Sequence, residues 1–220
     1  MTWRQCTRTA LATVGRMSEH APTSDVVFVR EDDPRCQELE ELGYTVTGYS
    51  WGANLRLDET SDVTTLIERV KKATRDGFSI RELDVEDLEL VVALERRTAD
   101  DYPVTLATNH VAPTLDMLIE LLADGARAWG AFSGDELIAV TLAKSRGERW
   151  NSEFTSVLSQ FRGRGIGSAV KSASVVALFN EGHRWFSTGG AESNGASLGA
   201  NLALGYVLEP RWRTYVMNLA

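Results

Sequence analysis

The sequence is poor in the residues that build metal sites, disulfides, membrane spans and nucleic-acid surfaces. Its 220 residues include two cysteines, Cys6 and Cys36, and three histidines, none at a metal-ligand spacing, so we expect free thiols and no metal. No apolar run approaches the roughly 18 residues of a membrane-spanning helix, and the start lacks the continuous apolar core of a signal peptide. The formal net charge of −8 disfavours broad nucleic-acid binding. We therefore expect a cytoplasmic protein that binds neither membranes nor nucleic acid.

The remaining composition is that of an ordinary globular protein. Hydrophobic residues make up 43% of the chain and charged residues 25%, which suits a packed core with a solvated surface. The length fits one large domain, or one domain with part of a second. Against the acidic background, Arg162, Arg164 and Lys171 lie close together, and this clustering indicates an anion site.

The C-terminal two thirds of the chain shows the clearest pattern of strands and helices. Alternating or β-branched residues between glycine-containing turns predict strands, and apolar residues at helical spacing predict helices, in an order typical of an α+β fold around one central sheet. The pair Gly189-Gly190 is expected to end one of the strands. The predicted strands are 127–132, 137–143, 150–158, 185–188, 206–208 and 212–217, and the predicted helices are 84–100, 114–123, 166–180 and 194–204.

The first 75 residues show a shorter pattern that resembles the C-terminal end. We expect a helix at 10–17, a strand at 26–29 and a helix at 34–41. The run Leu42-Gly43-Tyr44 then precedes strand-like residues, as Leu204-Gly205-Tyr206 does near the other end, which predicts a weak internal repeat. We therefore expect a partial, degenerate half-domain with a charged connector at 1–75, and the main domain at 76–220.

The strongest motif for chemistry is Gln160-Phe161-Arg162-Gly163-Arg164-Gly165-Ile166-Gly167-Ser168, which lies between a predicted strand and a predicted helix. Glycines at alternate positions let the backbone approach a bulky anion. Free N–H groups at a helix start carry partial positive charge and suit a pyrophosphate, to which the two arginines can add charge-assisted hydrogen bonds. Lys171, further along the helix, is expected either to face solvent or to reach an additional phosphate.

Two other glycine-rich motifs fit this sequence less well. A P-loop ends in Gly-Lys-Ser/Thr, which is absent, and a dinucleotide fingerprint follows the first strand of a βαβ unit. Here the glycines follow predicted antiparallel hairpins late in the chain. The remaining structural explanation is a tight strand–helix turn that binds nothing.

The pattern Gln160-x-x-Gly163-x-Gly165 resembles the Gln/Arg-x-x-Gly-x-Gly/Ala motif of the GCN5-related N-acetyltransferases (GNATs). Asn194, Asn201 and the run Leu204-Gly205-Tyr206 resemble that family's second coenzyme-binding helix and the Leu-Gly-Phe after it. The resemblance covers the chain from Leu83 onwards. It implies a GNAT-type α/β/α fold, with a mostly antiparallel mixed sheet that splays at an acyl-CoA site.

The resemblance also implies a reaction and a set of contacts. An acetyl or short acyl group would pass from acetyl-CoA, the cosubstrate, directly to a primary amine, with the backbone N–H of Val157 polarising the acyl carbonyl. Neither a metal nor an enzyme nucleophile is implied. The coenzyme-binding residues that it implies are Thr155, Ser156, Val157, Gln160, Arg162, Gly163, Arg164, Gly165, Ile166, Gly167, Ser168, Asn194 and Asn201.

One position departs from the family pattern. Where family members often carry a tyrosine that protonates the leaving thiolate, this chain has Asn201, whose amide is no useful proton source near neutral pH. The catalytic candidates are Asn201 and Glu153, with Glu192 as an alternative base, although either glutamate is equally explained as a surface ion pair. Asp100-Asp101-Tyr102 lies where the family shapes its acceptor pocket, and acidic groups there favour a cationic amine.

Three functions remain open from the sequence. The first is an N-acetyltransferase acting on a small-molecule or peptide amine. The second is an acyl-CoA-binding sensor or scaffold without catalysis, which the asparagine at position 201 favours. The third is a nucleotide-binding protein that uses the same glycine turn. The N-terminal unit is expected either to pack on the main domain or to form a homodimer interface.

Overall fold

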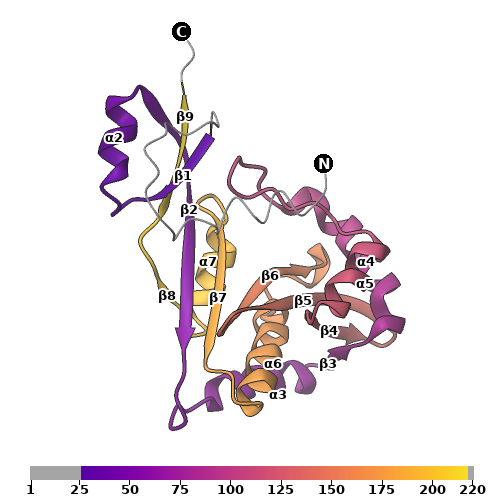
Figure 1. Cartoon of the computed structure of the whole chain (residues 1–220). Helices are drawn as coiled ribbons and strands as arrows, with labels where there is room; N and C mark the ends of the chain where they lie inside the picture. The colour runs from indigo at the N-terminus through magenta and orange to yellow at the C-terminus, as the bar shows by residue number, and fades with distance from the viewer. Residues whose placement is uncertain (1–25, 218–220) are drawn as a thin grey trace.

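The structure is a computed structural model that describes residues 26–217, and the helix predicted at 10–17 lies outside them. Within this range, strands and helices are mixed along the chain, with two successive α-helices followed by three successive strands in its middle part (Figure 1). The strands are β1 (Val26–Arg30), β2 (Tyr44–Arg56), β3 (Ser79–Leu83), β4 (Arg127–Ser133), β5 (Glu136–Arg146), β6 (Arg149–Val157), β7 (Trp185–Ala191), β8 (Val207–Leu208) and β9 (Trp212–Met217). The α-helices are α2 (Arg35–Glu41), α3 (Thr64–Arg75), α4 (Leu88–Thr98), α5 (Leu115–Ala123), α6 (Ile166–Asn180) and α7 (Gly195–Leu202).

The strands form one continuous sheet in the order β1-β9-β2-β7-β6-β5-β4-β3, and β8 pairs with β2. Every neighbouring pair is antiparallel except β6 and β7, which are parallel. The predicted α+β fold with a central, mostly antiparallel sheet is therefore confirmed. No helix within the described range is both long and apolar enough to cross a membrane.

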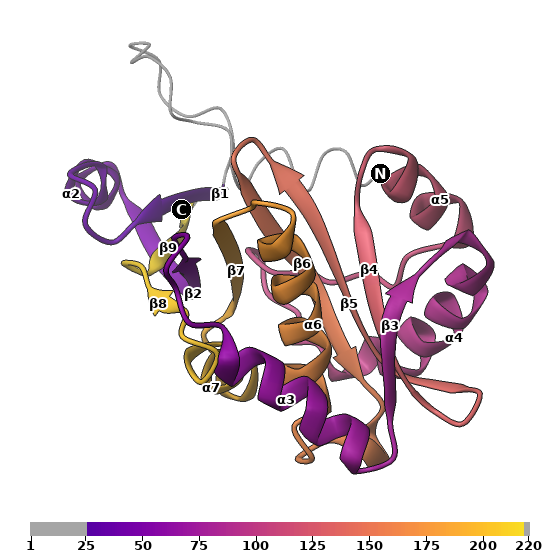
Figure 2. The same ribbon diagram turned by 90° about the horizontal axis from the view of Figure 1, so that it is seen from below.

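The helices cover both faces of the sheet. α3 packs beside α6 (Figure 2). The start of α6 lies close to β6, because a Cβ placed on Gly167 would be 3.0 Å from Val157 Cγ2 and 3.9 Å from Thr155 Cγ2. On the other face, Glu95 of α4 accepts a hydrogen bond from Ser156. Since neighbouring residues of a strand point to opposite faces, α6 and α4 cover opposite faces of β6.

Local sequence explains where several helices begin. The Thr114 side chain accepts a hydrogen bond from the backbone N–H of Met117 at the start of α5. Asn194 caps α7 in the same way by accepting from the N–H of Ser197. α6 instead starts from Gly165, whose φ of +79° only glycine adopts easily.

The strand β7 runs through Gly189-Gly190, so the prediction that this pair ends a strand is wrong. β7 pairs along its full length with β2, and Trp51 of β2 lies against it. A Cβ on Gly190 would lie 2.8 Å from the Trp51 ring, and one on Gly189 would lie 2.9 Å from the Trp51 carbonyl oxygen. The glycines therefore make room for the tryptophan, whose Nε1 donates to the Ala191 carbonyl at 2.9 Å.

The N-terminal strands join the sheet of the main domain. β9 lies between β1 and β2, and β2 pairs with both β9 and β7. The pairing of β2 with β8 and β9 is symmetric when residues are counted from the tyrosine of each Leu-Gly-Tyr run. Val46, two residues after Tyr44, pairs with Tyr215, nine residues after Tyr206. Leu208, two residues after Tyr206, pairs with Ala53, nine residues after Tyr44. The origin of the N-terminal unit as half of a second domain, and the domain boundary near residue 75, stay predictions.

Two hydrophobic cores stabilise the sheet. The larger one fills the space between β2–β7 and the helices α3 to α6. The smaller one joins the N-terminal unit to β9 and consists of Val29, Cys36, Leu39, Tyr44 and Tyr215. Cys36 is a free, buried thiol.

Candidate functional site

The parallel strands β6 and β7 separate after a short stretch of pairing. Their last paired residues are Asn151 and Ser187. Beyond this pair, residues 152–157 of β6 and 188–191 of β7 have no partner in each other, and Figure 1 shows the two strands diverging there. We call these two unpaired segments the β6–β7 divergence.

Backbone N–H groups of β6 point into this divergence. The N–H of Leu158 donates to the Ile138 carbonyl of the neighbouring segment at 2.9 Å, so by antiparallel alternation the N–H and C=O groups of Val157 and Thr155 point away from β5. The C=O of Val157 accepts from Arg162, and that of Thr155 accepts from Tyr102. The N–H groups of Thr155 and Val157 are left without an acceptor among the described residues. Ser156 pairs with β5, so its backbone does not face the divergence, contrary to its predicted role.

The glycine loop before α6 presents a second set of N–H groups. Gly163 and Gly165 have φ values of +71° and +79°, and nothing lies within 4 Å of a Cβ built on either. The N–H groups of residues 163–168 donate to no other group within the described range, and the helix ladder begins with the bond from Ala169 to Gly165. This is the arrangement expected for a diphosphate at a helix start. Gln160 lies at the exposed beginning of the loop.

The two arginines of the loop already have protein partners. Arg162 forms an ion pair with Asp101 and also donates from Nε to the Val157 carbonyl at 2.9 Å. The hydrogen bond from Arg162 holds the pKa of Asp101 below its usual range. The Arg164 guanidinium lies 5.1 Å from the centre of the Phe78 ring. The free amides are thus available to an anion, and so is the Arg164 guanidinium, whose ring contacts leave its N–H groups unused within residues 26–217.

The predicted helix residue Asn201 is buried, and its partner is a lysine. Lys171 Nζ donates to Asn201 Oδ1 at 2.5 Å and to Thr188 Oγ1 at 3.0 Å. Asn201 in turn donates from Nδ2 to the Ser197 carbonyl at 2.8 Å. Lys171 is only 4% exposed, so the expectation that it faces solvent or binds phosphate is wrong. Burial lowers its pKa to about 7.

A second polar cluster lies on the α4 face of the divergence. Glu95, fully buried, accepts hydrogen bonds from Ser156 and from His110 Nε2, the latter at 2.6 Å. The Tyr102 hydroxyl lies 2.6 Å from Ser156 Oγ, and its ring stacks on His110 with centroids 3.9 Å apart. Burial, followed by the charge of Glu95, raises the pKa of Tyr102.

Sequence reasoning missed the two central members of this cluster, Glu95 and His110. A signal for Glu95 was present, because it continues the buried helical stripe of Leu88 and Val91. A glutamate at an apolar position of a helix needs a buried partner. The partner, His110, belongs to the loop before α5, and no local pattern links the two.

The other predicted acidic candidates are held in ion pairs. Glu153 accepts from Arg146 at 3.0 Å and from Asn151 at 3.2 Å, and Glu192 accepts from Arg211 at 2.8 Å. These ion pairs and hydrogen bonds already occupy carboxylate oxygens of both residues. The structural explanation that the sequence left open for both glutamates therefore fits the geometry.

Comparison with known proteins identifies the fold through structure and not through sequence. No protein-family model matches the sequence, and no curated protein matches it. A GCN5-related N-acetyltransferase from Sphaerobacter thermophilus matches the structure with a TM-score of 0.65 at 13% identity, over 86% of this chain and 58% of that chain. A tandem GNAT protein from the clavulanic acid biosynthesis pathway, solved without AcCoA, matches with a TM-score of 0.61 at 19% identity, over 86% and 62%.

A third match, a GCN5-related N-acetyltransferase from Kribbella flavida, has a TM-score of 0.56 at 15% identity and covers 89% of this chain and 68% of that chain. These likenesses confirm the expected GNAT fold. The chain spans about three fifths of the length of the first two structures.

Proposed function

We propose that this protein transfers an acetyl or similarly short acyl group from acetyl-CoA to a primary amine. One observation carries the proposal: the free N–H groups of residues 163–168 and those of Thr155 and Val157 lie at the same end of β6. The first set suits a diphosphate, and the second suits an extended, amide-containing arm. Coenzyme A contains both, and the GNAT fold supports the same ligand.

The chain's own residues would divide the binding between them. The amides at the start of α6 would hold the pyrophosphate, where the open space around Gly163 and Gly165 admits a bulky anion. The arm would then run along the divergence and bond to Thr155 and Val157 as an added strand does. Arg162 and Arg164 would add positive charge close to the phosphates, although each also contacts the protein.

Acyl transfer needs a polarised carbonyl and a proton acceptor. The N–H of Val157 would donate to the thioester carbonyl oxygen, on which negative charge grows as the amine attacks. The C–N bond forms as the C–S bond breaks, so no enzyme nucleophile is needed. We assign the proton acceptor to His110, because Glu95 holds its Nε2 and leaves the other ring nitrogen for the amine.

The acceptor is a primary amine carried by a small molecule or a peptide. Its approach from the α4 face follows from the position of His110, because the coenzyme's phosphates occupy the α6 side. A preference for cationic amines was expected from Asp100 and Asp101, but the charge of Asp101 is balanced by Arg162. Asp100 is exposed and is the remaining acidic group of that pair.

Two measurements in sequence test the proposal. Acetyl-CoA at 100 times its dissociation constant should stabilise the protein by about 2.7 kcal/mol in a thermal melt, and ATP or NAD should not. A panel of amines with acetyl-CoA should then release free thiol. Stabilisation without thiol release from a broad panel indicates an acyl-CoA sensor, and no stabilisation by acetyl-CoA refutes the binding site.

Substitution of one loop glycine gives a sharper test with a matched control. Gly165→Asp places a carboxylate where the diphosphate would lie, and we expect acetyl-CoA affinity to fall by at least about 10-fold. Gly147→Asp, in the β5–β6 turn, is the control, since Gly147 also has positive φ (+69°) and open space around its Cβ. Equal affinities in two folded variants would contradict the assignment.

A further inference from the structure

The proposed reaction leaves one buried titratable group unused, the ammonium of Lys171. Its Nζ contacts Asn201 and Thr188, which are neutral, and lies 4.9 Å from the centre of the Tyr206 ring. No carboxylate of the described residues forms an ion pair with it. Burying an ammonium without a counter-charge is costly, and proteins retain such groups mostly where they have a function.

The position of Lys171 relates it to the divergence. Thr188, which it contacts, follows directly after Ser187, the last residue of β7 that pairs with β6. The ammonium therefore lies where the two strands part. It comes from α6, on the face that also carries the free amides of residues 163–168.

His110, the proton acceptor, and the ammonium of Lys171 thus lie on opposite faces of the sheet. Glu95 and His110 reach β6 from α4 through Ser156, whereas α6 faces the side chains of Thr155 and Val157. A thioester bound by its diphosphate at the α6 start brings its sulfur from the α6 face. An amine accepted by His110 attacks from the other face.

We propose that Lys171 donates the proton that the coenzyme sulfur takes up as it leaves, and that Asn201 positions the ammonium for this transfer. The inference rests on the proposed function. It accounts for the asparagine at position 201, which cannot itself supply a proton but holds the Nζ of a lysine that can.

Protons and bonds balance in this scheme. The substrate ammonium loses a proton to His110, and the free amine forms the C–N bond while the C–S bond breaks. The electron pair of that bond goes to sulfur, which takes the proton of Lys171. The nitrogen of the new bond then loses its second proton to His110, which has by then released the first to solvent. His110 thus passes two protons to solvent and Lys171 regains one, so each turnover yields an amide, a free thiol and one net proton.

The surroundings allow this donation near neutral pH. Burial lowers the pKa of Lys171 to about 7. The groups that face it are Asn201 from α7, Thr188 from β7 and Tyr206 after α7, and burial raises the pKa of Tyr206, so its hydroxyl stays neutral. An ammonium of this kind is a stronger acid than an exposed lysine.

The first experiment measures the bound product and does not require turnover. The thiol pKa of free coenzyme A bound to the protein is read from thiolate absorbance. We expect it to lie at least about one unit below the ordinary thiol value of about 8.5, since the ammonium favours the thiolate. Lys171→Met should abolish the shift, and Lys71→Met, which removes an exposed lysine of α3, should not.

The second experiment uses catalysis. Lys171→Met should lower kcat by about 100-fold, with the KM for acetyl-CoA within about threefold, and should remove the fall of kcat at alkaline pH. Asn201→Asp retains the lysine and places a carboxylate on its ammonium, so this fall should move to higher pH by about one unit or more. The second variant tests the idea even if the first does not fold.

The outcomes separate this inference from the proposed function. If coenzyme A binds and wild type and Lys171→Met give the same thiol pKa, Lys171 is not the donor, and the acyltransferase proposal stands. If Asn201→Asp does not move the fall of kcat at alkaline pH, Lys171 is likewise not the donor. If neither coenzyme A nor acetyl-CoA binds, both proposals fall. A shifted thiol pKa in a protein that acetylates no amine places Lys171 beside the sulfur but refutes the amine transfer, and the proton donation falls with it.

Discussion

Two segments of this protein, residues 26–44 and 185–206, have the same order of strand, helix and Leu-Gly-Tyr and bury different side chains, and each is called a unit below. In each unit a strand and a helix lead into Leu-Gly-Tyr, with glycine φ values of +90° at Gly43 and +91° at Gly205. Both tyrosines are buried. The positions that correspond when counted back from them are Leu39 in α2 and Asn201 in α7. The first lies in an apolar core, and the second holds a lysine.

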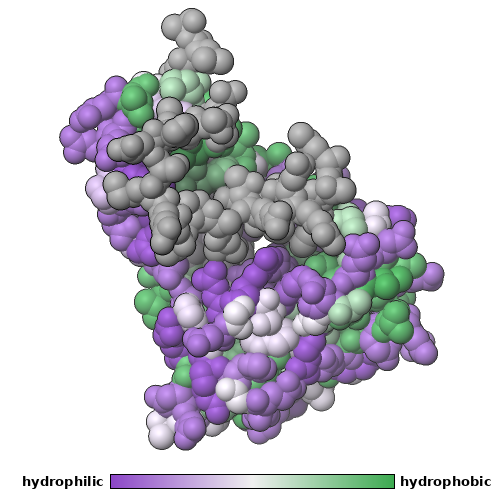
Figure 3. Space-filling view, in the orientation of Figure 1, coloured by the Kyte–Doolittle hydropathy of each residue, from purple (hydrophilic) through white to green (hydrophobic). Residues whose placement is uncertain are grey.

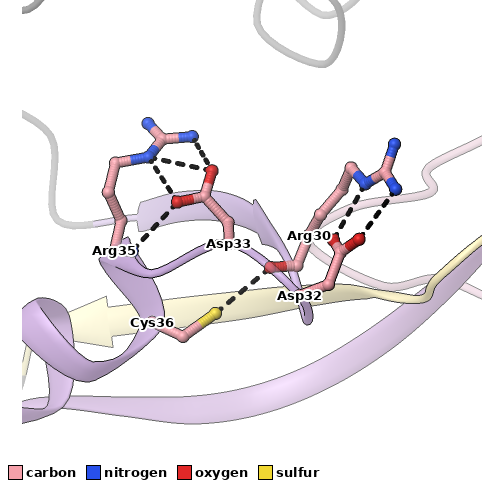
Figure 4. Close-up of polar contacts among 5 residues, drawn as sticks. All are labelled: Arg30, Asp32, Asp33, Arg35 and Cys36. Atoms are coloured by element: carbon pink, nitrogen blue, oxygen red, sulfur yellow. Dashed lines mark hydrogen bonds and ion pairs between the residues drawn. The ribbon is translucent and has the colours of Figure 1, made fainter.

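The polar groups around α2 and those around α6 and α7 differ in the same way. In the β1–α2 turn, Arg30 pairs with Asp32 and Arg35 with Asp33, and the Cys36 thiol donates to the Arg30 carbonyl at 3.2 Å (Figure 4). These four charged side chains thus satisfy one another. Near α6 and α7, by contrast, backbone amides have no acceptor and a buried ammonium has no counter-ion among residues 26–217. The fold therefore depends on the shared backbone plan, whereas the unsatisfied groups indicate function.

The surface gives a related contrast. Figure 3 shows a mostly hydrophilic face, with apolar residues gathered over α4 and α5, where Leu90 and Ile119 are exposed. The loop between these helices also exposes Val104, Leu106 and Val111. Val104, Leu106 and Val111 belong to the same loop as His110, so an acceptor with an apolar portion would find contacts there.

The largest effect that we expect is on the pH dependence of stability, and it comes from the buried ammonium of Lys171, which has no counterpart in the apolar N-terminal unit. Lysine keeps its ordinary pKa of 10.5 in the unfolded chain and about 7 in the folded one, so the unfolded state binds more protons between these values. The destabilisation by Lys171 is complete below pH 7 and is lost as pH rises to 10.5. Urea unfolding of Lys171→Met and wild type should therefore show a difference that changes by about 5 kcal/mol across this window. Parallel pH curves would contradict the buried ammonium.

The next prediction introduces a polar group into the apolar unit. Leu39→Asn should lower the free energy of unfolding by about 3 kcal/mol, because the small core loses apolar contacts and gains an amide without partners. Leu39→Met should cost less than about 1.5 kcal/mol and serves as the control. Chemical denaturation measures both, and an asparagine tolerated as well as methionine would show that this unit also accepts polar groups.

The third prediction concerns catalysis on the α4 face. Glu95→Gln should lower kcat by about 100-fold without a change in acetyl-CoA affinity, since His110 loses the carboxylate that orients it. Glu89→Gln, an exposed position of the same helix, should have no such effect. Steady-state kinetics decides between the candidates. A larger loss from Glu153→Gln would move the proton acceptor to β6.

The fourth prediction tests the junction between the two units. Gly190→Ala should destabilise the protein by about 2 kcal/mol, because its Cβ would lie 2.8 Å from the Trp51 ring. Gly48→Ala, also in the sheet but with open space around its Cβ, should cost less than about 1 kcal/mol. Thermal melts compare them, and equal stabilities would mean that Trp51 moves aside freely.

The smallest expected effect concerns the ion pair over the glycine loop. Asp101→Asn frees the Arg162 guanidinium, so acetyl-CoA should bind about threefold more tightly, while stability changes by less than about 1 kcal/mol. Calorimetric titration gives the affinity. Weaker binding would show that Asp101 orders the loop rather than competing for the arginine.

Local patterns in the sequence predicted most of the C-terminal elements. The bounds of α6 and β9 agree with the predicted ones, because helical spacing and β-branched runs are properties of neighbouring residues. β3 was missed since its sequence, Ser79–Leu83, carries two charges and little apolar periodicity. The extent of β2 was also missed, because its second half is fixed by β7, far along the chain.

The residues of the candidate site also differ in whether the sequence could predict them. The glycine loop could be predicted because its chemistry is local. The bonds of Lys171 to Asn201 and of Glu95 to Ser156 join residues 30 and 61 positions apart, so no window of sequence contains them. Buried polar networks of this kind become visible only when the chain is folded.

The placement of β9 between β1 and β2 has a consequence for synthesis. In the described chain, β1 pairs only with β9, and β2 pairs only with β7, β8 and β9. During synthesis β1 and β2 therefore wait, with unpaired edges, until Trp212–Met217 has been made. Such distant pairing slows folding and exposes edges that can aggregate. The nascent protein should depend on chaperones until β9 is inserted.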